Sequence, residues 1–201
     1  MIPLSQLWYR FCRCVLWATV KLLFRFRSFG SEHVPPTGPV LVVSNHQSHL
    51  DPVLAGVASP RQLRALARRS LFVGPFGWLI RSLGAFPIDL EGSGIAGLRA
   101  SLKILKGGEA LLVFPEGTRT ADGSLGPLRS GFCALARRSG ATIVPAAING
   151  SFAALPRGAR FPQMRPITLR FAPPITPNDF EQLTDDQLVE LTTTRIAACL
   201  Q

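Results

Sequence analysis

Two residues of complementary chemistry, His46 and Asp51, stand five positions apart in the polar stretch 44–52, which follows the apolar run 39–43. An imidazole can act as a general base near neutral pH, and a carboxylate can hold its tautomer and orientation. We therefore interpret His46 as a base and Asp51 as its orienting partner. The alternative interpretation is that Asp51 caps a following helix, with Pro52 at its first position, beside an incidental histidine.

A second polar turn, residues 115–120, follows another apolar run at 110–114. Gly117 in this turn lets the backbone approach a ligand, and Arg119 offers a planar fork for phosphate or carboxylate. The alternative is an exposed, salt-bridged loop. Because ligands of open α/β sheets bind at the carboxyl ends of the strands, the two turns together predict one shared site.

The elements that position these turns are predicted from hydrophobic periodicity. Buried or edge strands are expected at 39–43, 62–67, 84–89, 110–114, 141–148 and 167–171, and helices at 52–58, 95–105, 129–139 and 178–200. The stretch 74–80, interrupted by glycine and proline, is interpreted as a hydrophobic elbow. The alternation of strands and helices predicts an α/β fold with a mixed, largely parallel central sheet flanked by helices.

The first 29 residues contain five basic residues and no acidic one. On a helical projection of 8–27, one side carries Trp8, Phe11, Cys12, Val15, Leu16, Leu22, Leu23 and Phe26. The opposite side carries Arg10, Arg13, Lys21, Arg25 and Arg27, with Trp17 and Phe24 among them. A basic amphipathic helix with large aromatic residues is typical of an anionic membrane surface. The alternatives are a helix that packs on the domain, or a signal peptide, against which the internal basic residues argue.

We accordingly divide the chain into a membrane-associating helical segment, 1–29, and a catalytic domain, 30–201. Its 201 residues carry a net charge of +10, and residues 176–201 hold one basic residue against five acidic ones. The mean hydropathy is +0.24, yet no segment gives a clean membrane-spanning signal. Such charge permits anionic lipid, nucleic acid or acidic small molecules as partners. The four cysteines lack metal-site or disulfide spacing and are expected to be reduced, which points to the cytosol.

Four ordered stretches resemble the glycerolipid acyltransferase family, whose best-known members are the 1-acylglycerol-3-phosphate acyltransferases. They are Asn45-His46-x-Ser48-x-x-Asp51, the block from Arg68 to Ile88, Phe114-Pro115-Glu116-Gly117-Thr118-Arg119, and Ile143-Val144-Pro145. The resemblance covers roughly residues 30–175. It implies that His46 removes the proton from a glycerol hydroxyl, which attacks the thioester of acyl-CoA or acyl-carrier protein. Asp51 is then the orienting carboxylate, and the product is phosphatidic acid, a phospholipid precursor.

The same resemblance implies that the loop Glu116-Gly117-Thr118-Arg119 holds the acceptor phosphate, with Arg119 as its ionic contact and Arg68 adding charge. Glu116 is expected to orient an arginine or to bind a hydroxyl, because its carboxylate would repel a phosphate. A thioester needs no metal or cofactor, so none is expected. The implied location is the cytoplasmic face of a membrane, with membrane lipids as partners.

One departure concerns the acceptor. The family's second block commonly ends Ile-Asp-Arg, whereas here Ile88-Asp89 is followed by Leu90 and Glu91. The acceptor is therefore 1-acylglycerol-3-phosphate or, alternatively, a lyso-ornithine lipid or another lysophospholipid. A thioester or ester hydrolase is a second enzyme hypothesis, although the Gly-x-Ser-x-Gly elbow is missing. A non-catalytic binder of anionic lipid or nucleic acid is a third; no nucleic-acid partner is expected.

Overall fold

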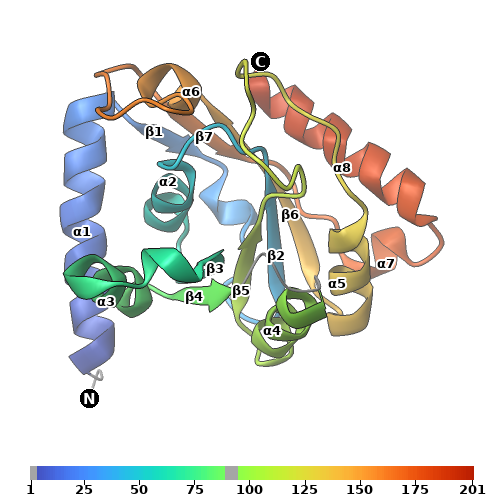
Figure 1. Cartoon of the computed structure of the whole chain (residues 1–201). Helices are drawn as coiled ribbons and strands as arrows, with labels where there is room; N and C mark the ends of the chain where they lie inside the picture. The colour runs from blue at the N-terminus through green and yellow to red at the C-terminus, as the bar shows by residue number, and fades with distance from the viewer. Residues whose placement is uncertain (1–3, 89–94) are drawn as a thin grey trace.

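The computed structural model describes residues 4–88 and 95–201, and in them the chain folds around one seven-stranded sheet (Figure 1). The strand order is β1-β7-β6-β2-β5-β3-β4. The strands are β1 (Arg27–Phe29), β2 (Val40–Ser44), β3 (Leu63–Arg68), β4 (Ala85–Ile88), β5 (Ala110–Val113), β6 (Thr142–Asn149) and β7 (Thr168–Phe171). Every pair of neighbours is parallel except β6 and β7, which confirms the predicted mixed, largely parallel sheet.

Strand β2 lies at the centre of the sheet, and all five of its residues are buried. Its uninterrupted apolar run is typical of a parallel strand that is covered on both faces. Val43 pairs with Val113 of β5 and with Pro145 of β6, so the three strands end at the same edge. This register brings the polar turns after β2, β5 and β6 together.

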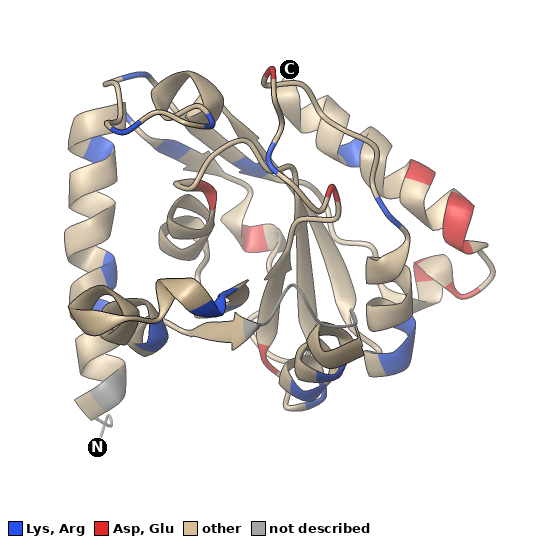
Figure 2. Cartoon of the chain, viewed as in Figure 1, with Lys and Arg blue, Asp and Glu red and all other residues tan. Residues whose placement is uncertain are grey.

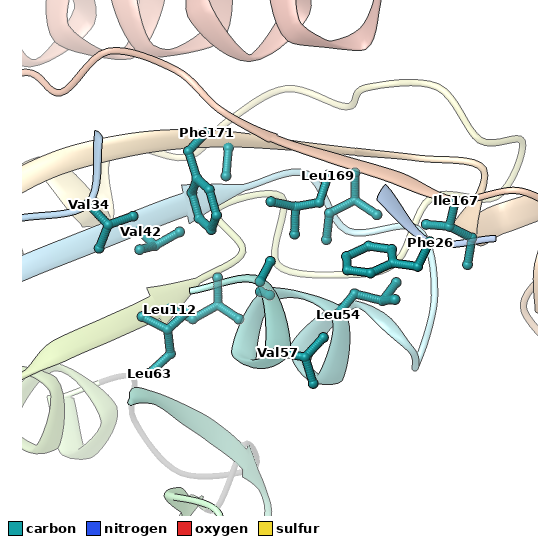
Figure 3. Close-up of a cluster of buried hydrophobic side chains, with 14 of the residues drawn as sticks. Phe26, Val34, Val42, Leu54, Val57, Leu63, Leu112, Ile167, Leu169 and Phe171 are labelled. Carbon is teal, nitrogen blue, oxygen red and sulfur yellow. The ribbon is translucent and has the colours of Figure 1, made fainter. Parts of the chain in front are cut away.

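Helices cover both faces of the sheet, as an α/β fold requires (Figure 1). They are α1 (Leu4–Phe24), α2 (Asp51–Ala58), α3 (Gly74–Ser82), α4 (Ile95–Lys106), α5 (Gly131–Ser139), α6 (Ser151–Ala154), α7 (Pro177–Phe180) and α8 (Asp185–Leu200). On one face α1 and α2 close a core of apolar side chains that point toward one another, among them Phe26, Leu54, Leu112, Leu169 and Phe171 (Figure 3). On the other face, residues of α4, α5 and α8 close a second core with Leu41 and Ile143.

Three local expectations were wrong. The single helix predicted over 178–200 is two helices, α7 and α8, because Thr184 caps the start of the second. The stretch interpreted as an elbow is helix α3, in which Pro75 occupies the first turn, where proline is tolerated. Gly77 is required there because a Cβ atom would collide with the backbone of Phe72. The N-terminal helix also ends at Phe24, three residues early, because Arg25 adopts a left-handed conformation with φ of 46°.

The first 29 residues share the core of the rest of the chain. Val20 and Phe24 of α1 are buried in it, and the guanidinium of Arg13 donates to the carbonyl of Val57 at 3.2 Å. Strand β1, which follows the helix, pairs with β7. The membrane-associating role assigned to this segment remains a prediction. Within residues 4–88 and 95–201, no helix has both the length and the apolar character needed to cross a bilayer.

Candidate active site

The side chains of His46 and Asp51 meet at the carboxyl end of β2, with His46 Nδ1 at 2.9 Å from Asp51 Oδ2. Asp51 is completely buried, whereas the imidazole is 19% exposed. If the Nδ1 proton points to the carboxylate, the opposite nitrogen, Nε2, carries the lone pair that a base needs. The pair therefore has the geometry predicted for a base and its orienting partner, while its catalytic role remains a prediction.

The carboxylate of Asp51 accepts three further hydrogen bonds. Its Oδ2 atom receives the backbone N–H groups of Gln47 at 2.6 Å and Ser48 at 2.7 Å, and its Oδ1 atom receives the hydroxyl of Ser151 at 2.6 Å. Asp51 is the first residue of α2, and no side-chain capping bond is made at this end of the helix. The alternative that Asp51 merely caps the helix is thus wrong, because its carboxylate binds the preceding turn instead.

Backbone and side-chain contacts join the turn of His46 to the turn after β5. The imidazole stacks on the ring of Phe114, with 4.0 Å between centroids and 14° between planes. The carbonyl of His46 accepts from the N–H of Thr120 at 2.8 Å, and its own N–H donates to Glu116 Oε1 at 2.8 Å. The two polar turns predicted to share one site therefore lie in direct contact.

Both carboxylate oxygens of Glu116 accept hydrogen bonds from backbone N–H groups. Only 8% of the residue is exposed, and its second oxygen, Oε2, accepts from the N–H of Gly126 at 3.2 Å. Burial raises the pKa of Glu116, and the hydrogen bonds from His46 and Gly126 oppose that rise. The contacts in the described part of the chain thus show a clamp between two turns, while the role of Glu116 in orienting an arginine or binding a substrate hydroxyl remains a prediction.

Several basic residues interact electrostatically with one another and with the His46–Asp51 pair. Burial lowers the pKa of Arg119, and the charges of Arg157 and Arg68 lower it further, while Asp51 opposes them. Burial likewise lowers the pKa of His49, followed by the charges of Arg119 and His46. The two arginines predicted to bind the acceptor, Arg68 and Arg119, therefore share one electrostatic neighbourhood with His49 and Arg157. A dianion placed there would be attracted by the three arginines, and the lowered pKa of His49 favours a neutral ring that can donate a hydrogen bond.

The rest of the predicted loop is exposed. Gly117 and Thr118 present their surfaces to solvent beside half-buried Arg119. Gly117 has a φ of 76°, and a Cβ atom would come within 3.1 Å of the guanidinium carbon of Arg129. The absence of a side chain at Gly117 therefore permits both the backbone turn and the close approach of Arg129. Asp89, Leu90 and Glu91, on which the question of the acceptor depends, lie outside the described residues.

Sequence reasoning missed the contribution of the turn after β6. Ser151 binds Asp51, the N–H of Phe152 donates to Gln47 Oε1 at 3.3 Å, and Ser48 Oγ donates to the carbonyl of Leu155 at 2.9 Å. A signal was present, because polar residues 149–151 follow a predicted buried strand just as the other two turns do. Arg157 was missed too, since nothing local distinguishes it from other surface arginines.

An apolar cavity of about 120 Å³ lies next to the start of α2. Pro52 and Val53, which follow Asp51 directly, form part of its wall together with Leu16 of α1, Leu63 of β3 and Ile80 of α3. It therefore extends from the start of α2, next to Asp51, into the layer between α1 and the sheet. Among the residues that the structure describes, no group of three or more His, Cys, Asp or Glu side chains could hold a metal ion.

Comparison with known proteins assigns this arrangement to a class. The family model "Acyltransferase" matches residues 25–149, which include both polar turns and β6. The chain belongs to this acyltransferase family.

Within this family, the chain is similar to proteins of known name. The chain is 31% identical over 144 residues to the 1-acyl-sn-glycerol-3-phosphate acyltransferase of Bacillus subtilis, and the match covers 71% of each protein. It is 30% identical over 150 residues to the chloroplastic 1-acyl-sn-glycerol-3-phosphate acyltransferase LPAT1 of Arabidopsis thaliana, covering 72% of this chain but 42% of that one. The chain thus spans less than half the length of this second relative.

A solved structure has the same fold. The crystal structure of the 1-acyl-sn-glycerophosphate acyltransferase PlsC from Thermotoga maritima superimposes with a TM-score of 0.85 and 24% identity. The superposition covers 98% of this chain and 79% of that one, so it includes α1 as well as the sheet.

Proposed function

We propose that this protein is an O-acyltransferase that moves a fatty acyl group from a thioester to the free hydroxyl of a lysolipid. The acceptor we favour is 1-acylglycerol-3-phosphate, which gives phosphatidic acid. The observation that carries the proposal is the His46–Asp51 pair beside the cations around Arg119, in a chain of the acyltransferase family. Both relatives described above are named for this acceptor.

The reaction requires one proton to move twice. Nε2 of His46 takes the proton of the acceptor hydroxyl while that oxygen attacks the thioester carbonyl carbon. The carbon–sulfur bond then breaks, and the imidazolium returns the proton to the departing thiolate. Buried Asp51 stabilises the imidazolium through the 2.9 Å hydrogen bond, and Phe114 fixes the plane of the ring.

The acceptor phosphate is assigned to Arg119 and Arg68. Charge-assisted hydrogen bonds between a guanidinium and phosphate are strong and geometrically specific. Arg157 adds positive charge at the same place. This concentration of cations supports a phosphate-bearing acceptor even though Leu90 occupies the position of the family's usual arginine.

An acyl chain and the membrane complete the proposal. The apolar cavity, part of whose wall is formed by Pro52 and Val53, offers a place for part of an acyl chain. The donor is acyl-CoA or acyl-carrier protein, and both share the thioester. We assign the enzyme to the cytoplasmic face of a membrane, where exposed apolar residues of α1 such as Phe11 and Leu22 contact lipid.

An acyl-transfer assay on a panel of acceptors tests the proposal. Purified protein and labelled acyl-CoA or acyl-carrier protein are incubated with 1-acylglycerol-3-phosphate, a lyso-ornithine lipid or lysophosphatidylglycerol. We expect labelled phosphatidic acid as the main product. A main product from another lysolipid would overturn the acceptor. Release of free thiol with no acylated lipid in any reaction would instead indicate a hydrolase.

A further inference from the structure

The loop between α6 and β7, residues 155–167, exposes two large apolar side chains. Phe161 is 82% exposed and Met164 is 77% exposed. Three arginines stand around them in the sequence, Arg157, Arg160 and Arg165, and all three are exposed. Such a combination of exposed apolar and cationic side chains is unfavourable in water but suits the boundary between lipid head groups and acyl chains.

Hydrogen bonds hold this loop in its exposed position. The N–H of Gln163 donates to the carbonyl of Ala154 at 2.7 Å, which closes the loop on itself. Gly150, which precedes α6, has a φ of 90°, and a Cβ atom there would collide with the carbonyl of Pro166, so the end of the loop lies against the start of α6. The exposure of Phe161 and Met164 is therefore a property of a tethered segment.

The loop lies beside the C-terminal end of α1 (Figure 1). The N–H of Ile167 donates to the carbonyl of Phe24 at 3.0 Å, and the N–H of Arg27 donates to the carbonyl of Ile167 at 3.1 Å. Leu22, at the same end of α1, is 82% exposed. The apolar surface of the loop is thus a neighbour of the apolar surface already assigned to lipid.

Charge favours an anionic partner at this corner of the molecule. The fold joins two stretches without any acidic residue, 1–31 and 123–178, through the pairing of β1 with β7. Figure 2 shows basic residues over the loop and the adjacent end of α1, while acidic residues gather at α7 and the start of α8. A surface of anionic lipid attracts each exposed cation by about 1 kcal/mol.

We propose that residues 155–167 form a second membrane contact, in which Phe161 and Met164 enter an anionic bilayer and the arginines bind lipid phosphates. The inference rests on the proposed function only in taking the acceptor to be a membrane lipid. An acidic acyl-carrier protein is the competing partner for the charge. The bilayer is favoured because the apolar residues of the loop continue those of α1.

The loop is also attached to the catalytic turn. Its first residue, Leu155, accepts the hydroxyl of Ser48 at 2.9 Å, and Arg157 contributes its charge at Arg119. Docking of the loop therefore sets the position of the imidazole relative to the head groups. Two contacts, α1 and the loop, fix an orientation that a single helix lying on the surface does not.

Vesicle binding of the full-length protein tests this contact. Co-sedimentation is measured with vesicles of phosphatidylethanolamine and phosphatidylglycerol for wild type, for F161S/M164S, and for the control I95S. Ile95 is also exposed but lies on α4, which covers the opposite face of the sheet. We expect the double variant to lose about tenfold or more in partitioning, because two large apolar side chains no longer enter lipid. I95S should bind like wild type.

The cationic part of the contact has its own variant, R160Q/R165Q. Each lost arginine should weaken binding to these vesicles about fivefold, with a smaller effect on vesicles of phosphatidylcholine alone. Hydrogen–deuterium exchange of the wild-type protein should show protection of 155–167 on the phosphatidylglycerol vesicles. Protection of α1 without protection of the loop, or wild-type binding by F161S/M164S, would overturn the inference. Loop protection by acyl-carrier protein but not by vesicles would assign the surface to that protein instead.

These binding measurements need no catalysis, so their outcome is independent of the proposed function. The F161S/M164S variant should keep wild-type acyl transfer to acceptor in detergent micelles and lose it on vesicles. If no acyl transfer is found for wild type, the proposed function fails while loop binding can still hold. If transfer is normal and loop binding is absent, the loop inference alone fails.

Discussion

Asp51 is the side chain on which the geometry of the site depends most. It is completely buried, and it accepts hydrogen bonds from a histidine ring, two backbone amides and a serine hydroxyl. A buried carboxylate is stable only when its oxygens have such partners. The hydrogen bonds thus keep the carboxylate buried and aligned with the imidazole.

The Ser151 hydroxyl can be removed without altering the turn itself or the imidazole. We expect S151A to lower kcat about tenfold with little change in KM, because the second oxygen of Asp51 loses its partner while the acceptor site is intact. Initial rates of acyl transfer over a range of acceptor concentrations measure this. S151T, which keeps the hydroxyl, is the matched control. An S151A variant with wild-type kcat would contradict the positioning role.

At the residue scale, the sequence predicts contacts between side chains that are close in the chain better than contacts between distant ones. His46 and Asp51 could be paired because five residues separate them and each has chemistry that the other completes. Ser151 reaches Asp51 from a turn that is remote in the sequence, so only the sheet register reveals it. Glu116 was assigned a ligand role because its burial between two backbone amides cannot be inferred from residue type.

At the scale of elements, three strands that end at one edge create the site. The carboxyl ends of β2, β5 and β6 carry the turns that supply His46, Glu116 and Ser151 respectively. Glu116 connects the first two turns by accepting one amide from each side. Its carboxylate is consequently an internal support, and its replacement should affect stability before it affects binding.

Replacement of Glu116 by glutamine tests this support. We expect E116Q to lower the free energy of unfolding by about 1–3 kcal/mol, because one carboxylate oxygen becomes an amide that cannot accept from a backbone N–H. Urea unfolding at pH 7 measures the loss. E190Q on the surface helix α8 is the control, and it should unfold like wild type.

The same variant also gives a pH dependence. Burial raises the pKa of Glu116 above its ordinary value of 4.5, so the folded protein binds this proton more tightly than the unfolded chain. The contribution of the group to stability is therefore complete below pH 4.5 and is lost as the pH rises through the raised pKa. The stability advantage of wild type over E116Q should grow between pH 7 and pH 5. A shrinking difference would instead show that the hydrogen bonds from His46 and Gly126 outweigh burial and lower the pKa of Glu116.

Strands and long helices were predictable because their periodicity is regular over many residues. Helix α3 was not, since glycine and proline at 74–77 are typical of a turn. Gly77 is tolerated there because the helix packs against the backbone of Phe72, a tertiary contact that a sequence pattern does not contain. The early end of α1 at Phe24 has the same kind of cause, because β1 must begin at Arg27 to pair with β7.

For the whole molecule, the uneven charge along the sequence becomes an uneven charge in space. The two acid-free stretches meet at one corner, while α7 and α8 bear acidic residues away from it (Figure 2). The sequence predicted the basic N-terminal helix but not the loop at 155–167 that joins it. The exposed apolar side chains, the cations and the turn that carries His46 are thereby connected within one folded unit.

The rate of labelled phosphatidic acid formation by H46A is the measurement that tests the central claim most directly. We predict a fall of at least about 100-fold in kcat, because general-base catalysis by a positioned side chain contributes this much or more. Vesicle binding and urea unfolding should remain close to wild type. H33A, which removes a histidine that contacts the carbonyl of Phe171 away from the site, should retain activity. An H46A variant within a few-fold of the wild-type rate would contradict the account.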